Sequence, residues 1–382
     1  MKMRIIVSGG GTAGHITPAI AIADKLKELD EGCEIVFVGS RNGMENKLVP
    51  RAGYPIWQLD VKGIKRKLSL DNFKAVWQTV KAVKRSKELI RDFKPDAVLG
   101  TGGYVCYPIL KAAADMGVYT ALHESNAIPG LAVRMLKKRA DKIFVSFEEC
   151  ARTLNVGEKA LVTGNPVKNA SQELSREQAR EKLGMNGRYR YLLISFGGSL
   201  GAKTVNACAL EVMDKLSTRR ADILHIHAYG KNDASEFFEE FKRRGYDKYK
   251  NIVVNEYIYD MPIYMRAADA VMCRSGAMTL AELASSGIAS VLIPSPNVTA
   301  NHQYKNAIAF ENVGAAFVVD EKKGSAPEQA LGYVSAIISD KELRQNMSRR
   351  ALELAHPNAS ETIASEILRG VKQKREATND LN

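Results

Sequence analysis

The stretch from Cys273 to Asn306, CRSGAMTLAELASSGIASVLIPSPNVTANHQYKN, predicts a strand end, a turn, a short helix, a second strand and the start of another helix. Residues 270–273 have the length and composition of a buried strand, and residues 274–276 turn the chain into a helix that begins near Ala277. The first amides of a helix have no partner within it, and the helix dipole adds positive potential there. We therefore predict a diphosphate site at this helix start.

Polar side chains recur at helical spacing on both predicted helices of this stretch. Thr279 and Glu282 lie three residues apart and so share a helix face, where a carboxylate can accept hydrogen bonds from both ribose hydroxyls. The same pair also fits a capping box, which would satisfy the helix amides without a ligand. Gln303 and Asn306 share a face of the second helix, and two amides suit the hydroxyls of a sugar. Together the two pairs favour a nucleotide-sugar site.

The composition is that of a globular protein with an anionic partner. The length of 382 residues suggests about two domains, and no apolar run approaches the ~18 residues of a membrane span. The amino end, MKMRIIVSGGG, lacks the features of a signal peptide, so we expect a cytoplasmic location. Five cysteines are scattered singly, which predicts neither a zinc site nor a disulfide framework. The net charge of +12 indicates nucleic acid, a phosphorylated substrate or an acidic membrane surface as partner.

Strands and helices alternate along the chain, which predicts an α/β fold with parallel sheets covered on both faces. A strand at residues 3–7 is followed by a glycine-rich loop and a helix. The alternation pauses near residues 163–166, and the same layout restarts with a strand at residues 191–196. We therefore expect two Rossmann-like halves. The predicted segments are residues 1–164, residues 165–359, and residues 360–382, the last being a helix that crosses back to the first domain and a frayed tail.

The glycine-rich loops allow more than one interpretation. Gly9, Gly11 and Gly14 fit the G-x-G-x-x-G fingerprint, so this segment alone suits an NADP-dependent oxidoreductase equally well. The second glycine loop, residues 197–201, argues against that, because a dehydrogenase needs one such cradle. In the second loop Ala202 separates the last glycine from the lysine, which is not the junction of an ATP-binding P-loop.

Two further loops place polar groups at strand ends in the first half. Residues 101–104, TGGY, form either an amide-lined anion site or a tight turn. Residues 123–130, HESNAIPG, put four polar side chains where open α/β sheets bind ligands. His225 and His227 alternate within an apolar strand and are expected to be structural, as is His356.

Residues 62–94 carry eleven basic residues against three acidic ones. One interpretation is a crossover helix with a solvated basic side. The other is a membrane-surface patch, centred on residues 64–70 and helped by residues 131–139, because basic residues interleaved with apolar ones favour anionic lipid headgroups. Nucleic acid is not expected, since no series of base-stacking aromatic residues is present.

Six motifs resemble, in order, the MurG family of bacterial cell-wall glycosyltransferases: GGGTAGH, HESNAIPG, TGNPV, SFGGSLGAKTVN, CRSGAMTLAEL and HQYKNA. The resemblance implies the GT-B fold, with two Rossmann-like domains facing across a cleft, and a peripheral protein on the cytoplasmic face of the cell membrane. It also implies an inverting transfer of N-acetylglucosamine from UDP-N-acetylglucosamine to the C4 hydroxyl of undecaprenyl-pyrophosphoryl-N-acetylmuramyl-pentapeptide in peptidoglycan synthesis. A lipid-bound acceptor would account for the basic segment.

The resemblance assigns roles to individual residues. The donor would contact Thr12, Ala13, Gly14 and Asn126 in the first domain, and Lys168, Ser199, Ile258, Ala277, Met278, Thr279, Leu280, Ala281, Glu282, Gln303 and Asn306 in the second. The acceptor would contact Gly102, Gly103, Tyr104 and Glu124. Ile258 would lie along uracil, Glu282 would bind ribose, and Ser199 with the amides of residues 277–279 would bind the diphosphate. No metal or other cofactor is expected, since the sequence has no Asp-x-Asp triplet to bridge a diphosphate through a metal.

Four residues depart from the family pattern: Ala13 for Gly, Ser125 for Gln, Lys168 for Arg and Leu200 for Gln. Leu200 cannot form a hydrogen bond through its side chain, and Lys168 lacks the planar two-pronged donor of arginine.

The ordinary pKa of histidine, near 6.5, suits a general base at neutral pH. We predict that His15 is the base that deprotonates the acceptor, because it lies where the loop of the acceptor domain faces the predicted cleft. Glu124 is the alternative base. The rival functions are an epimerase acting on the same donor, another glycolipid glycosyltransferase, an NADP-dependent oxidoreductase and a catalytically silent membrane adaptor.

Overall fold

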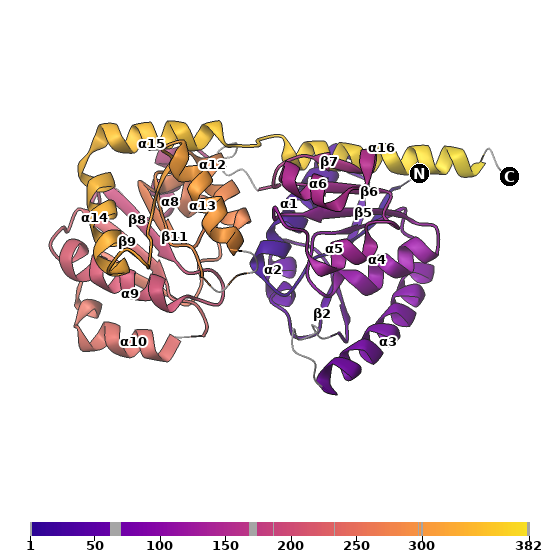
Figure 1. Ribbon diagram of the computed structural model, residues 1–382, viewed down its shortest axis with the longest axis horizontal. Helices are drawn as coiled ribbons and strands as arrows, with labels where there is room; N and C mark the ends of the chain where they lie inside the picture. Colours follow the sequence, from indigo (N-terminus) through magenta and orange to yellow (C-terminus); the bar gives the residue numbers. More distant parts are fainter. Residues whose placement is uncertain are drawn as a thin grey trace. The chain divides into compact units, whose positions relative to one another are not determined.

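The computed structural model describes residues 2–61, 70–167, 174–185, 187–232, 234–296, 298 and 301–379. Packing divides the chain into two compact units. Unit 1 holds residues 1–167 and 356–382, and unit 2 holds residues 168–355. Each unit is a sheet flanked by helices (Figure 1), so the predicted pair of α/β domains with parallel sheets is confirmed.

Unit 1 contains a seven-stranded sheet in its described part, with the order β3-β2-β1-β4-β5-β6-β7 and every pairing parallel. The strands are β1 (Arg4–Ser8), β2 (Glu34–Ser40), β3 (Ile56–Leu59), β4 (Ala97–Gly100), β5 (Tyr119–Glu124), β6 (Lys142–Val145) and β7 (Ala160–Val162). The strand order reverses between β1 and β4, so the loops that follow these two strands lie side by side at the carboxyl edge. That is the edge where sheets of this type bind ligands.

Helices cover both faces of the unit 1 sheet, and two apolar clusters, one on each face, bury the strand residues. The helices are α1 (Ala13–Leu29), α2 (Glu45–Arg51), α3 (Leu70–Phe93), α4 (Cys106–Asp115), α5 (Leu131–Leu136), α6 (Glu148–Leu154) and α16 (Ala359–Asn379), with a 3-10 turn η1 at Gly157–Lys159. α1 and α16 belong to one cluster, whereas α3, α4 and α5 contribute to the other.

The last helix, α16, packs on unit 1. Its Ile363, Ile367 and Val371 are buried in the cluster that also holds α1. Lys374 forms a salt bridge of 2.9 Å with Asp141, which adds a polar contact to the apolar one. The packing places the boundaries between the units after residues 167 and 355, where the sequence analysis had them after residues 164 and 359.

Unit 2 contains a six-stranded parallel sheet in its described part, with the order β10-β9-β8-β11-β12-β13. The strands are β8 (Tyr191–Phe196), β9 (Ile223–Ala228), β10 (Ile252–Asn255), β11 (Ala270–Cys273), β12 (Ser290–Leu292) and β13 (Ala316–Val318). The helices are α8 (Arg176–Lys182), α9 (Lys203–Val212), α10 (Ala234–Arg243), α11 (Met261–Ala267), α12 (Ala277–Ser286), α13 (His302–Asn312), α14 (Ala326–Ser339) and α15 (Lys341–Glu353), with short turns η2 (Met213–Ser217) and η3 (Tyr246–Lys248). Its strand order also reverses, between β8 and β11.

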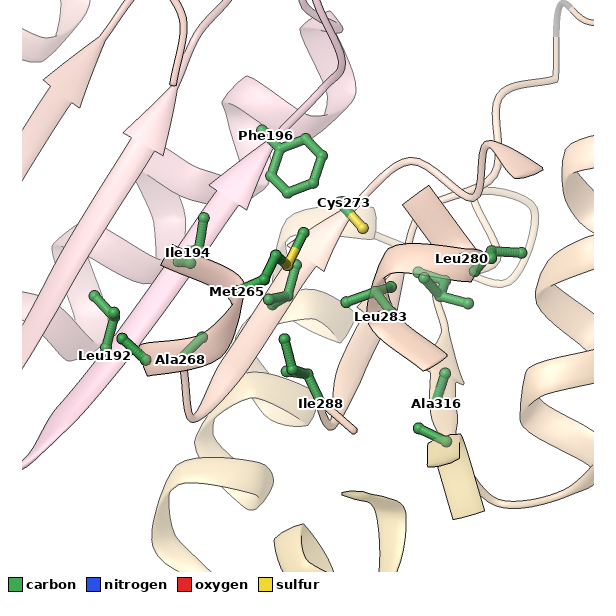
Figure 2. Close-up of a cluster of buried hydrophobic side chains, with 14 of the residues drawn as sticks. Leu192, Ile194, Phe196, Met265, Ala268, Cys273, Leu280, Leu283, Ile288 and Ala316 are labelled. Carbon is green, nitrogen blue, oxygen red and sulfur yellow. The ribbon is translucent and has the colours of Figure 1, made fainter. Parts of the chain in front are cut away.

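The core of unit 2 fixes the position of α12. Leu280 and Leu283 from this helix pack into the same cluster as Cys273 of β11 and Ile288, as Figure 2 shows. The strand, turn and helix predicted for this stretch are therefore confirmed. The helix is capped by Gly276 in an extended conformation and ends at Gly287, whose φ of 62° suits glycine.

The capping-box interpretation of Thr279 and Glu282 is wrong. A capping box requires its Ser or Thr at the N-cap position, one residue before the first helical residue. The helix begins at Ala277 and its N-cap is Gly276, so Thr279 and Glu282 both lie within the first turns of α12. Their side chains share a helix face, as the spacing predicted.

Candidate functional site

His15 lies in the first turn of α1, directly after the glycine-rich loop that follows β1. Its ring nitrogen Nδ1 is 3.0 Å from the carbonyl oxygen of Gly10 and 3.4 Å from Oγ1 of Thr12. A carbonyl oxygen only accepts hydrogen bonds, so Nδ1 must carry the proton in the neutral ring. The second ring nitrogen, Nε2, therefore keeps a lone pair that can accept a proton.

The loop after β4 packs against His15 through glycines that tolerate no side chain. A Cβ added to Gly102 would lie 2.5 Å from Cδ2 of His15, and one on Gly103 would overlap the carbonyl group of Gly10. The φ angles of Gly102 and Gly103, 118° and 85°, also exclude most other residues. Thr101 completes the contact by donating a hydrogen bond of 2.7 Å to the carbonyl oxygen of His15. The structure thus brings together the predicted base and two of the predicted acceptor residues.

Glu45 is a buried carboxylate that sequence analysis missed. It accepts hydrogen bonds from the amide and hydroxyl of Ser40, at 2.8 and 2.6 Å, and from the amide of Gly11 at 3.1 Å. Its exposed fraction is 0%. Tyr104, a predicted acceptor residue that is 40% exposed, reaches the Ser40 hydroxyl at 3.4 Å. Because the Gly11 amide already donates to Glu45, it is not available to a dinucleotide pyrophosphate in this loop, which argues against the oxidoreductase interpretation.

Glu124 organises the loop that follows β5. One carboxylate oxygen accepts from both the amide and the side chain of Asn126, each at 3.0 Å, and the other accepts from the amide of Gly130 at 2.7 Å. Both oxygens are therefore engaged within the loop. No hydrogen bond occupies Nε2 of His15 among the described residues, so of the two candidate bases His15 has the more available lone pair.

The TGNPV motif, residues 163–167, forms hydrogen bonds that support the loop after β5. The Asn165 side chain accepts a hydrogen bond of 2.7 Å from Ser146 and donates one of 3.1 Å to the carbonyl oxygen of Ser125. His123, at the end of β5, is fully buried, and burial lowers its pKa to about 4. Because it stays neutral at physiological pH, His123 supports the loop as a structural group.

In unit 2, the start of α12 lies beside the start of α13. The Ser275 hydroxyl donates to the carbonyl oxygen of Gln303 at 2.9 Å, and the Asn306 side chain reaches the carbonyl oxygen of Ser275 at 3.5 Å. The side-chain oxygen of Gln303 accepts from the amide of Ser295 at 2.9 Å, which ties in the loop after β12. The predicted sugar-binding amides thus stand at the turn that precedes the predicted diphosphate helix.

Glu282 is partly buried in α12, and this burial raises its pKa to about 7. Desolvation disfavours the charged carboxylate, so the group titrates near neutral pH. Carboxyls with strongly shifted pKa values occur more often at functional sites than elsewhere, which marks Glu282 as a ligand-binding candidate.

Several other predicted donor residues lie on or near these loops. Thr12 is the N-cap of α1, and Ala13 and Gly14 are its first residues. Ser199 lies in the loop between β8 and α9, next to Leu200, which is 49% exposed. Ile258 is only 4% exposed because its side chain packs in the unit 2 core, so little of that side chain is left to lie along a base. Lys168 lies outside the described residues.

The predicted membrane-surface patch is described only in part, because residues 62–69 lie outside the described ranges. Further along α3, Trp77 and Val80 are 61% and 64% exposed, and Lys81 places its ammonium 3.5 Å from the Trp77 ring centroid. On α5, Leu131 and Met135 are 55% and 51% exposed. No helix in the described part of the chain is long and apolar enough to cross a membrane.

The comparisons with known proteins agree with this geometry. The N-terminal domain model of glycosyltransferase family 28 matches residues 5–145, and the C-terminal domain model of that family matches residues 192–363. A relative from Acetivibrio thermocellus is 39% identical and covers 98% of this chain and 100% of its own length. One from Bacillus subtilis is 39% identical and covers 95% and 98%. Both are named UDP-N-acetylglucosamine--N-acetylmuramyl-(pentapeptide) pyrophosphoryl-undecaprenol N-acetylglucosamine transferase.

Solved structures support the same fold. The crystal structure of Acinetobacter baumannii MurG has a TM-score of 0.65 and 27% sequence identity, and covers 96% of this chain and 99% of that one. A UDP-GlcNAc 2-epimerase from Neisseria meningitidis has a TM-score of 0.66 at 15% identity, covering 96% and 100%, and shows the fold alone. The predicted GT-B fold and glycosyltransferase class are thereby confirmed. With a family model matching each half of its sequence and relatives that align over nearly its full length, the chain belongs to glycosyltransferase family 28, within the MurG family of transferases.

Proposed function

We propose that this protein transfers N-acetylglucosamine from UDP-N-acetylglucosamine to the C4 hydroxyl of undecaprenyl-pyrophosphoryl-N-acetylmuramyl-pentapeptide, with inversion at the anomeric carbon. The observation that carries the proposal is the 39% identity, over 98% of this chain, to a relative named for that transfer. The geometry of both units is consistent with it, because each carries polar groups at the carboxyl edge of its sheet.

Unit 2 binds the donor in this proposal. The diphosphate lies at the start of α12, where the glycine cap leaves room for it and the helix dipole favours negative charge. Glu282 accepts hydrogen bonds from the ribose hydroxyls and Gln303 binds the sugar, while Asn306, only 6% exposed, supports the turn at Ser275. Ser199 adds a hydroxyl donor from the loop after β8.

Unit 1 binds the acceptor and supplies the base. The loop with Gly102, Gly103 and Tyr104 holds the acceptor pyrophosphate, and Nε2 of His15 takes the proton of the C4 hydroxyl. As that oxygen forms its bond to the anomeric carbon, the bond from this carbon to UDP breaks, and UDP leaves with the electron pair. The α12 dipole stabilises the negative charge that develops on UDP.

The membrane-bound acceptor requires the protein to work at a lipid surface. The exposed apolar residues of α3 and α5 and the basic segment at residues 62–94 provide the chemistry for an anionic bilayer. We propose that the protein associates peripherally with the cytoplasmic face of the cell membrane through this region.

A transfer assay tests the proposed function. Labelled UDP-N-acetylglucosamine is incubated with the muramyl lipid, and the lipid-linked disaccharide is followed. We expect disaccharide and UDP only when both substrates are present. An epimerase would instead convert the donor without acceptor, an oxidoreductase would bind NADPH with no response to UDP, and a silent adaptor would bind vesicles without turnover. Any of these three results would contradict the proposal.

A further inference from the structure

A network of buried, hydrogen-bonded polar side chains runs through unit 2 from η2 to the end of β9. The Ser217 hydroxyl lies 3.0 Å from Nδ1 of His225, whose Nε2 lies 2.8 Å from the hydroxyl of Ser195. The same Ser195 hydroxyl lies 2.8 Å from Nδ1 of His227. Nε2 of His227 lies 3.2 Å from the side-chain oxygen of Asn206. All these side chains are at most 5% exposed.

The Asn206 end of this network determines the direction in which its hydrogen bonds run. The Asn206 side chain lies 3.2 Å from the carbonyl oxygen of Tyr229, which can only accept. Asn206 must therefore present its NH2 group to Tyr229 and its oxygen to His227. His227 in turn must donate from Nε2.

The remaining protons then follow one by one. Burial lowers the pKa of both histidines to about 3, so each ring is neutral and carries a single proton. With its proton on Nε2, His227 accepts at Nδ1 from the Ser195 hydroxyl. Ser195 has no second proton, so it accepts from Nε2 of His225, and His225 accepts at Nδ1 from Ser217. In this direction each link pairs one donor with one acceptor, and Ser217 gives its proton to His225 at 3.0 Å instead of to the Val212 carbonyl oxygen at 3.5 Å. The reverse direction would set the Asn206 oxygen against the Tyr229 carbonyl oxygen.

The Asn206 end of the network lies beside the glycine-rich loop that follows β8. Gly230, the residue after Tyr229, packs so closely on Gly201 that a Cβ at either position would overlap the other segment. The amide of Asn232 donates a hydrogen bond of 2.9 Å to the carbonyl oxygen of Leu200. The segment that Asn206 holds therefore clamps the loop that contains Ser199.

We propose that Ser195, His225 and His227 are positioning residues, which act through Asn206 to hold the loop 198–201 in the conformation that binds the donor diphosphate. The proposal rests on the proposed function, because it takes the donor to be UDP-N-acetylglucosamine. It adds a side-chain network beneath the binding loop, in which the two histidines transmit orientation and take no part in proton transfer. Loss of a link leaves an unpaired buried group and loosens the loop.

The direction of the hydrogen bonds in the network is tested on the wild-type protein without substrate. Proteins labelled with 15N at histidine report which ring nitrogen carries the proton, and the variants His225→Gln and His227→Gln assign the signals. We expect both rings to be protonated at Nε2 and bare at Nδ1. A His227 ring protonated at Nδ1, or a doubly protonated ring at neutral pH, would overturn the proposal whatever reaction the protein catalyses.

The effect on the donor is tested with paired variants. His227→Leu removes the donor to Asn206, whereas His227→Gln keeps an NH2 group near the position of Nε2. We expect His227→Leu to raise the KM for UDP-N-acetylglucosamine about tenfold with kcat within about threefold, and His227→Gln to recover most of that loss. An unchanged KM in folded His227→Leu would refute the positioning role.

A second pair guards against a variant that fails to fold. Ser195→Ala breaks the link between the two histidines, and Ser290→Ala removes another buried hydroxyl of the same sheet that has no hydrogen-bond partner among the described residues. We expect a raised donor KM only in Ser195→Ala. Equal KM values in the two variants would count against the network. A wild-type protein that makes no lipid-linked disaccharide would instead refute the proposed function. The 15N experiment would still test the hydrogen-bond direction, because it uses no substrate.

Discussion

The ring nitrogen Nδ1 of His15 lies 3.0 Å from the carbonyl oxygen of Gly10, and this contact determines which ring nitrogen can act as a base. Gly10 belongs to the loop after β1, whose backbone is held in turn by the loop after β4 through the hydrogen bond from the Gly10 amide to Gly102 at 3.3 Å. The backbone thus selects the tautomer with a bare Nε2, in the way that an orienting group commonly fixes a catalytic histidine.

Replacing His15 tests its role as the base. We expect His15→Ala to lower kcat by about 10²- to 10⁴-fold, the usual contribution of a general base, with donor and acceptor KM values little changed. His15→Asn is the sharper variant, because its amide can keep the hydrogen bond to Gly10 while lacking the basic Nε2. Its kcat should be as low as that of His15→Ala. A kcat near wild type for either variant, with binding intact, would assign the base elsewhere.

Binding of the donor should depend on pH through Glu282. Burial raises the pKa of this carboxyl to about 7 without ligand, and ribose hydroxyls that donate to the carboxylate would lower it in the complex. Binding then releases a proton, so affinity is highest above pH 7 and falls as the pH drops through 7, by up to about tenfold per pH unit. UDP-N-acetylglucosamine is the proper probe, because its diphosphate has no proton to lose near neutral pH.

Calorimetry in two buffers of different ionisation heat measures that proton release directly. The matched variant is Glu282→Gln, which keeps the shape of the side chain and cannot titrate. It should bind the donor more weakly at pH 8 and show no change in affinity between pH 6 and pH 8. Wild-type affinity that stays constant over this interval would place the ribose away from Glu282.

Local signals were sufficient to predict the strand, turn and helix at residues 270–287. An apolar run, a turn that includes Gly276 and a helical apolar spacing all indicate the same structure there. They did not settle whether Thr279 caps the helix or points to a ligand. A cap at Thr279 would need the helix to begin three residues later, at Leu280, and sequence patterns locate helix starts poorly.

Glu45 could not be predicted, because no local pattern distinguishes it from a surface acid in the first turn of a helix. Its burial depends on Gly10, Gly39 and Gly43, where an added Cβ would come into close contact with the carboxyl side chain. Gly39 and Gly43 lie just before Glu45 in the sequence, but Gly10 comes from the loop after β1, which only the folded sheet brings beside them. The space for a buried carboxylate is thus a property of tertiary packing.

The same packing predicts that Glu45→Gln destabilises unit 1. The hydrogen-bond partners of the carboxylate among the described residues, the Ser40 amide and hydroxyl and the Gly11 amide, all donate to it. A glutamine would set its NH2 group against one of these donors, at a cost of about 1–3 kcal/mol in the free energy of unfolding. Urea denaturation measures the change. Glu28→Gln, which loses only a surface pair with Lys25, should change it by less than about 1 kcal/mol.

The docking of α16 on unit 1 predicts opposite effects for two Gly→Ala substitutions. Gly332 lies inside α14 with nothing within 4 Å of an added Cβ, so Gly332→Ala should stabilise the protein by about 0.5–1 kcal/mol through helix propensity alone. Gly370 lies inside α16, where an added Cβ would overlap the ring and hydroxyl of Tyr119. Tyr119 is 7% exposed and cannot move into solvent without opening the contact, so Gly370→Ala should destabilise by about 1–3 kcal/mol despite the same gain in propensity.

Thermal and urea unfolding measure the stability of both variants. A truncated chain that lacks residues 360–382 tests the same contact in a second way. The truncation takes away the apolar side chains of α16 that are buried against α1, including Ile363 and Ile367, and should lower both stability and transfer activity. Because each helix loses the same glycine, the difference between Gly370→Ala and Gly332→Ala isolates the contact with Tyr119 from helix propensity. If both substitutions stabilise the protein equally, or if the truncated chain keeps its full stability and activity, α16 does not hold unit 1 through this surface.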